Sequence, residues 1–100
     1  GVQSVTDFSV WFGRLSPTSA QAKVEAKSTT KSITSKVQLQ KYVSSKSGYV
    51  NVKGVASTKT VSAKSIIHSP KFAVSSGGSY RGKVVVTSGS SKMTKYKKLS

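Results

Sequence analysis

Few side chains in this sequence can act as acids, bases or metal ligands. Its 100 residues contain one histidine, His68, two carboxylates, Asp7 and Glu25, and no cysteine. General acid–base catalysis usually needs histidine or paired carboxylates within reach of one substrate. Glycosidase chemistry would have to use Asp7 and Glu25 as its pair. We expect both on the surface beside lysines, because Glu25 lies between Lys23 and Lys27 in the sequence.

Other catalytic and metal-binding arrangements also lack support. A Ser-His-Asp triad can be assembled on paper from His68, Asp7 and any of 21 serines, but so many serines make the match uninformative and no Gly-x-Ser-x-Gly elbow is present. His68, two residues before Pro70, is expected in a loop or at an edge. One histidine and two separated carboxylates are too few ligands for a metal site. The sequence therefore predicts a protein that is not an enzyme and carries no cofactor or metal.

Lysine dominates the charge of the chain. Seventeen basic residues face two acidic ones, giving a net charge of +15, and only Arg14 and Arg81 are arginine. This surplus is about twice what solubility requires, so it favours a functional basic surface over simple protection of strand edges. The residues expected to bind an anionic surface are Lys23, Lys27, Lys36, Lys92, Lys95, Lys97 and Lys98, with Tyr96 as an interfacial anchor if it is exposed.

The elements that must position these lysines are strands. Fourteen valines, nine threonines and three isoleucines stand against three leucines and one methionine, and β-branched residues favour pleated sheets. Apolar residues alternate with polar ones in segments separated by Ser, Gly and Lys clusters. The expected strands cover residues 8–12, 20–27, 33–43, 49–53, 55–64, 71–74, 80–87 and 93–99. The sequence predicts an all-β chain, with residues 1–100 forming a single antiparallel β-sandwich of seven or eight short strands; the alternatives are a small barrel and a frayed basic tail at 92–100.

Two segments resemble parts of immunoglobulin-like domains. Residues 36–41 (KVQLQK) followed by 48–52 (GYVNV) have the rhythm of a central strand turning into its neighbour. Residues 77–84 (GGSYRGKV) resemble the tyrosine-corner entry to the penultimate strand, where Tyr80 would hydrogen-bond backward across the turn. Over residues 36–87 the chain is similar to small secreted immunoglobulin- or fibronectin-like β-sandwich proteins of Gram-positive bacteria.

That resemblance implies an immunoglobulin-like sandwich in a secreted bacterial protein. The chain departs from true immunoglobulin domains because it lacks both cysteines and places its only tryptophan, Trp11, in the first expected strand. A lack of cysteine is common in secreted Gram-positive proteins. The start at Gly1 rather than Met indicates a removed leader or the remnant of a tag. We therefore expect an extracellular localisation.

The charge and the resemblance together lead to a functional expectation. We expect a secreted cationic protein that binds an anionic membrane or cell-wall polymer, with an antimicrobial, bacteriocin-like activity. Lysine, as a solvated point charge, suits lipid headgroups, teichoic acids or acidic polysaccharide, whereas nucleic-acid readers favour arginine. One alternative is a non-catalytic adhesive or accessory module that binds a protein or polysaccharide receptor and tolerates high salt. A further alternative is nucleic-acid binding with a steep salt dependence.

Overall fold

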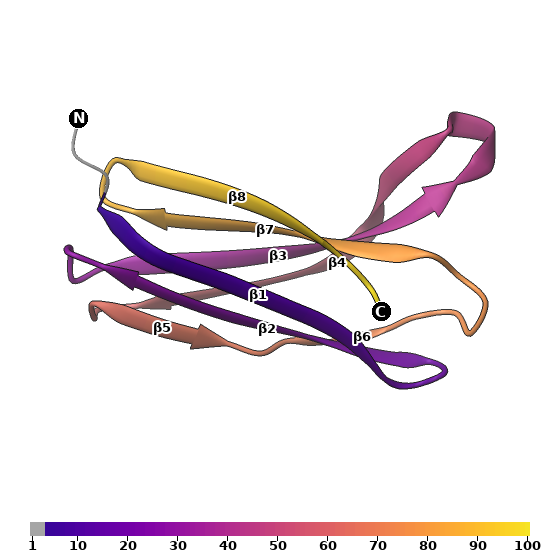
Figure 1. The fold of residues 1–100 in the computed structure, drawn as a ribbon, viewed down its shortest axis with the longest axis horizontal. Helices are drawn as coiled ribbons and strands as arrows, with labels where there is room; N and C mark the ends of the chain where they lie inside the picture. The colour runs from indigo at the N-terminus through magenta and orange to yellow at the C-terminus, as the bar shows by residue number, and fades with distance from the viewer. Residues whose placement is uncertain (1–3) are drawn as a thin grey trace.

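The structure is a computed structural model that describes residues 4–100. Within this range the chain forms strands and one short 3₁₀ helix, which confirms the all-β prediction (Figure 1). In chain order the elements are β1 Val5–Ser16, β2 Ser19–Ser28, β3 Ile33–Val43, η1 Ser44–Lys46, β4 Gly48–Val61, β5 Ser65–His68, β6 Lys71–Ala73, β7 Tyr80–Ser88 and β8 Ser91–Lys98.

The strands form two antiparallel sheets that pack face to face. The first sheet has the order β1-β2-β5, and β6 also pairs with β2. The second sheet has the order β4-β3-β7-β8. Figure 1 shows the two layers running lengthwise, with the end of the β3–β4 hairpin projecting past the other strands. The layered arrangement is that of a β-sandwich.

The hydrophobic core lies between the sheets because each strand turns alternate residues inward. The first sheet contributes a row of small side chains from β2, of which Ala20, Ala22 and Val24 are almost fully buried. The second sheet contributes larger ones, including Leu39 and Val84. Phenylalanines fill the space that the alanines leave: the rings of Phe12 and Phe72 meet edge to face at 6.4 Å. The first sheet therefore combines the small side chains of β2 with the large rings of β1 and β6, which lie beside them.

Strand β4 is one continuous strand, whereas the sequence predicts two strands at 49–53 and 55–64. The register with β3 shifts between Gln38 and Gln40, and Gly54 adopts a positive φ of 76° within the resulting bulge. The side-chain Nε2 of Gln38 donates to the carbonyl oxygens of both Val52 and Val55, each at 3.1 Å. A bulge leaves ladder groups unpaired, and the Gln38 side chain supplies the missing donor. The strand thus continues through the glycine that the sequence indicates as a break.

Two further segments are more ordered than the sequence predicts. Residues 65–68 form β5, a strand that the irregular pattern before Pro70 did not reveal. Residues 91–98 form β8 along the whole of β7, so the alternative of a frayed tail at 92–100 does not describe this segment. The chain end is also held, since the Leu99 N–H donates to the Tyr80 carbonyl and the Ser100 hydroxyl to the Phe12 carbonyl.

Candidate functional site

The outer face of the second sheet carries positive charge and no carboxylate. Strand register places one outward residue from each strand in rows across the sheet, and one row joins Asn51, Gln40, Arg81 and Lys98. We call this surface the basic face. Its charged residues on β3, β7 and β8 are Lys36, Arg81, Lys83, Lys92 and Lys98. Because they stand on adjacent strands of one sheet, their fields add on one side of the molecule.

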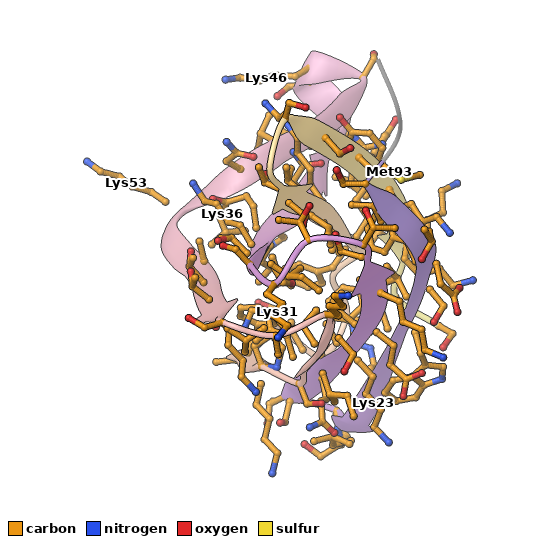
Figure 2. All side chains as sticks on the ribbon, turned by 90° about the vertical axis from the view of Figure 1, so that its left-hand side faces the viewer. Lys23, Lys31, Lys36, Lys46, Lys53 and Met93 are labelled. Carbon is orange, nitrogen blue, oxygen red and sulfur yellow. The ribbon has the colours of Figure 1, made fainter. Side chains whose placement is uncertain are left out.

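Both carboxylates of the chain lie on the other side. Asp7 and Glu25 are on the outer face of the first sheet, where Asp7 stands opposite Lys27 and Glu25 opposite Ser9. The basic residues of that face are Lys23, Lys27 and Lys71. Figure 2, viewed along the long axis, shows Lys36 and Lys53 extending on one side and Lys23 on the other. The excess charge is therefore distributed unequally between the two sheets.

Arg81 forms the centre of the basic face. Its guanidinium carbon lies 4.4 Å from the ring centroid of Tyr49 on β4 and 4.4 Å from that of Tyr96 on β8. A guanidinium over an aromatic face is attracted by the ring quadrupole. The Tyr49 ring in turn meets Tyr42 edge to face, with centroids 5.5 Å apart. Three tyrosines and one arginine, from all four strands of the sheet, thus form one contiguous group.

Hydrogen bonds to neighbouring strands also fix the Arg81 side chain. The Nε–H of Arg81 donates to Oε1 of Gln40 at 2.7 Å, and Nε2 of Gln40 donates to Oδ1 of Asn51 at 2.8 Å. Gln40 is buried although it belongs to the outer face, so its amide is a rigid support. Within residues 4–100 the terminal amino groups of Arg81 have no hydrogen-bond partner. They form the exposed edge of the group.

The other arginine has a different environment. Arg14 donates through Nη1 to the carbonyl of Pro17 at 2.7 Å and through Nη2 to the carbonyls of Gly78 and Ser75 at 2.8 and 3.2 Å. It thereby ties the β1–β2 turn to the loop before β7. Arg14 is a structural residue, whereas Arg81 directs its hydrogen-bonding edge outward.

The structure distributes the lysines predicted to bind anions over three surfaces. Lys36, Lys92 and Lys98 lie on the basic face together with Tyr96, whose side chain is 53% exposed. The remaining four lie elsewhere: Lys23 and Lys27 on the outer face of the first sheet, and Lys95 and Lys97 on the opposite side of β8 from Tyr96.

Lys95 has a structural contact across the sandwich edge. Its Nζ donates to the Phe8 carbonyl of β1 and lies 5.0 Å from the Phe8 ring centroid. At the opposite edge, Nζ of Lys59 donates to the Ile67 carbonyl of β5 at 2.7 Å. Each lysine thus reaches from an edge strand of the second sheet to a strand of the first. Such contacts cover edge carbonyls that would otherwise be open to another chain.

Sequence reasoning missed Arg81 and Lys83 as members of the site. Arg81 and Lys83 lie in a strand recognised by its apolar phase, which drew attention to Tyr80 and Val84 rather than to the residues between them. The signal was available, because residues that alternate with a buried phase must face outward. Their partners on β4 and β8 are set by strand pairing, which the sequence does not specify.

His68 lies on the edge strand β5, as one of the two predicted positions has it, but its side chain points into the sandwich. Its ring is buried and bridges the two sheets: Nδ1 is 2.9 Å from Oγ of Ser35, and Nε2 is 2.9 Å from Oγ of Ser57. Burial, aided by the positive charge of Lys59, lowers the pKa of His68 below its usual value. Neutral imidazole supplies one donor and one acceptor, which the two hydroxyls can complement. This histidine joins the sheets, and its neighbours are serines rather than acids.

Within residues 4–100, no three His, Asp or Glu side chains gather in a way that could hold a metal ion. The same part of the chain contains no helix long and apolar enough to cross a membrane. No protein family model matches the chain, and neither curated proteins nor solved structures give a significant match.

Proposed function

We propose that this protein binds an anionic polymer of cell surfaces through its basic face. The observation that carries the proposal is the segregation of charge: on β3, β7 and β8 the outer face of the second sheet has five basic residues and no acid, while both acids lie on the first sheet. A surface of one sign raises the local concentration of an oppositely charged partner and speeds its association. The roles proposed for Lys36, Lys92 and Lys98 follow from this placement.

The arrangement favours a polymer over insertion into a lipid bilayer. Membrane-surface proteins bury apolar side chains beside their basic ones. Here the exposed side chains Trp11 and Ile67 lie on the first sheet, opposite the basic face, while the exposed aromatic residues of the basic face, Tyr42 and Tyr96, carry hydroxyl groups. Between its charges the basic face instead carries hydroxyl groups, those of Thr34, Thr58, Thr60, Thr87 and Thr94. Such groups can hydrogen-bond a hydrated polymer such as teichoic acid or acidic polysaccharide.

We also propose that the sandwich is immunoglobulin-like, of the kind found in secreted Gram-positive proteins. The strand order β1-β2-β5 against β4-β3-β7-β8 supports this, since consecutive pairs of strands belong to the two sheets in turn and β3 pairs with the distant β7, as strands C and F do in that class. The N–H of Ser75 donates to the Tyr80 hydroxyl at 2.9 Å, the backward bond expected of a tyrosine corner. Gly78 permits it, because a Cβ there would lie 2.5 Å from the Tyr80 ring. An extracellular protein with an antimicrobial action at the cell surface remains our proposal for its role.

Two matched variants test the proposed surface. The triple variant Lys36→Gln, Lys83→Gln, Lys98→Gln alters the basic face, and its control Lys23→Gln, Lys27→Gln, Lys71→Gln alters the first sheet. Both lower the net charge from +15 to +12. Retention on purified cell walls and on teichoic acid is measured at low and at physiological salt.

The basic-face variant is expected to lose most of its retention, and the control to remain close to wild type. Equal losses in the two variants would contradict the proposal, because they would mean that net charge alone determines binding. Anionic vesicles and single-stranded DNA serve as additional ligands. Tighter binding to either would favour a membrane or nucleic-acid partner instead.

A further inference from the structure

Arg81 differs from the other charges of the basic face because its geometry is fixed. Two tyrosine rings sandwich the guanidinium at 4.4 Å each, and Gln40 accepts from its Nε at 2.7 Å. Gln40 is itself held by Asn51 at 2.8 Å. A free arginine would lose rotamer freedom on binding a ligand. Here that loss has already occurred on folding, so the side chain is preorganised.

The open edge of the Arg81 guanidinium, formed by its two terminal amino groups, matches the shape of an oxyanion. With Nε engaged, the two terminal amino groups present parallel N–H donors, the fork that matches two oxygens of a carboxylate, phosphate or sulfate. The charged neighbours are Lys98, its partner across β7 and β8, and Lys83, two residues along β7. Both are positive, and the face carries no acid that could occupy the fork.

The surroundings indicate what carries the oxyanion. Tyr96 and Tyr42 are 53% and 44% exposed on either side of the group, so flat ring surfaces flank the fork. The next outward row holds Gln38 and Lys83, and threonines follow one row further on. A sugar presents both flat C–H surfaces and hydroxyl groups, and amphipathic tyrosine suits this mixture. Insertion into a bilayer would favour wholly apolar side chains beside the charges, and the exposed Trp11 and Ile67 lie on the other sheet.

We infer that Arg81 is a preformed site for a single oxyanion group of an acidic carbohydrate polymer, with Tyr49 and Tyr96 as its side walls. The inference rests on the proposed function and deepens it, because it names one residue that recognises the ligand by geometry. The surrounding lysines attract the polymer without specifying its position. Carboxylate, sulfate and phosphate share the required chemistry.

Three variants separate geometry from charge. Arg81→Lys keeps the charge but removes the planar fork, Arg81→Gln removes both, and Lys83→Gln removes one charge from the same strand as a matched control. Dissociation constants are measured for polygalacturonate, dextran sulfate and teichoic acid, with neutral dextran as the uncharged polymer. Thermal unfolding of each variant checks that it is folded.

We expect Arg81→Lys to weaken binding about tenfold, nearly as much as Arg81→Gln, because a charge-assisted bidentate bond is lost in both. Lys83→Gln should weaken it only about two- to threefold and reduce its salt dependence. The polymer whose affinity falls most in Arg81→Lys identifies the oxyanion. If Arg81→Lys binds every polymer like wild type, the inference is wrong while the proposed basic face stands. If wild type binds none of them, both are wrong.

A measurement on the unaltered protein covers the case in which variants fail to fold. The chain has two arginines, so its arginine Nε–Hε region in a ¹⁵N–¹H NMR spectrum has two signals. Adding the polymer should shift the Arg81 signal and leave that of Arg14, which is held by backbone carbonyls, in place. Equal shifts of both, or none at saturating ligand, would overturn the inference. A larger Arg81 shift with single-stranded DNA than with any carbohydrate would overturn the choice of ligand class.

Discussion

Acidification is expected to weaken the packing of the two sheets through His68. The imidazole bridges Ser35 of β3 and Ser57 of β4 from β5, and its pKa in the folded protein is lowered, first by burial and then by Lys59. In the unfolded chain the ring takes up a proton near its ordinary pKa of about 6.5. Below that pH the unfolded state binds more protons than the folded state, so the free energy of unfolding falls.

The contribution of the His68 hydrogen bonds to the free energy of unfolding at neutral pH can be worked out from their burial. Ser35 is fully buried, and replacing it with Ala leaves Nδ1 of His68 without its partner inside the core. A buried polar group without a partner costs about 1–3 kcal/mol. Taking about 2 kcal/mol, the melting temperature of a domain of this size should fall by roughly 8–16 °C. His68→Gln can retain hydrogen bonds to the serines but does not titrate.

Thermal unfolding followed by circular dichroism between about pH 8 and pH 5 measures both effects. Wild type should be most stable above about pH 6.5 and lose stability progressively as the pH falls toward the lowered pKa of His68. His68→Gln should be nearly flat across this window, because carboxyl groups ordinarily titrate below it. The reasoning is refuted if wild type is equally stable across the range, or if His68→Gln shows the same acid loss.

Three further substitutions test how the site is positioned. Gln38→Ala should lower the melting temperature and speed hydrogen exchange in β4, because the carbonyls of the bulge lose their donor; unchanged exchange there would contradict this role. Gly54→Ala should lower the free energy of unfolding, measured with denaturant, by roughly 1–2 kcal/mol. The positive φ alone causes this loss, because a Cβ at this position would meet nothing within 4 Å; an unchanged free energy would show that the bulge relaxes. Tyr80→Phe should cost about 1 kcal/mol, the value of its bond with the Ser75 N–H; no loss would mean that water replaces the hydroxyl.

Strands with one buried face could be predicted from the sequence. Residues 20–27, 33–43 and 80–87 could be recognised because most of their alternate side chains enter the core, as Val24, Val37 and Val84 do. Strand β5 could not be found this way. Its inward residues are Ile66 and His68, and a buried histidine is acceptable only because Ser35 and Ser57, distant in sequence, complete its hydrogen bonds.

The candidate site was predictable in composition but not in position. Periodicity shows that Lys23 and Lys36 both face outward, yet strand pairing places them on opposite sides of the sandwich. The contacts of Arg81 with Tyr49 and Tyr96 join three strands whose neighbours are fixed only in the folded sheet. Charge surplus therefore predicts that an anionic partner exists, while the topology is needed to locate its surface.

Mapping a bound polyanion by NMR tests the central claim most directly. Backbone amide signals of the ¹⁵N-labelled protein are followed while teichoic acid or an acidic polysaccharide is added at physiological salt. The account predicts that the shifts concentrate in β3, β7 and β8, around Arg81 and Lys98, and leave β2 and β5 unchanged. Shifts centred on the first sheet, or spread evenly over all lysine-bearing strands, would contradict a binding surface on the second sheet.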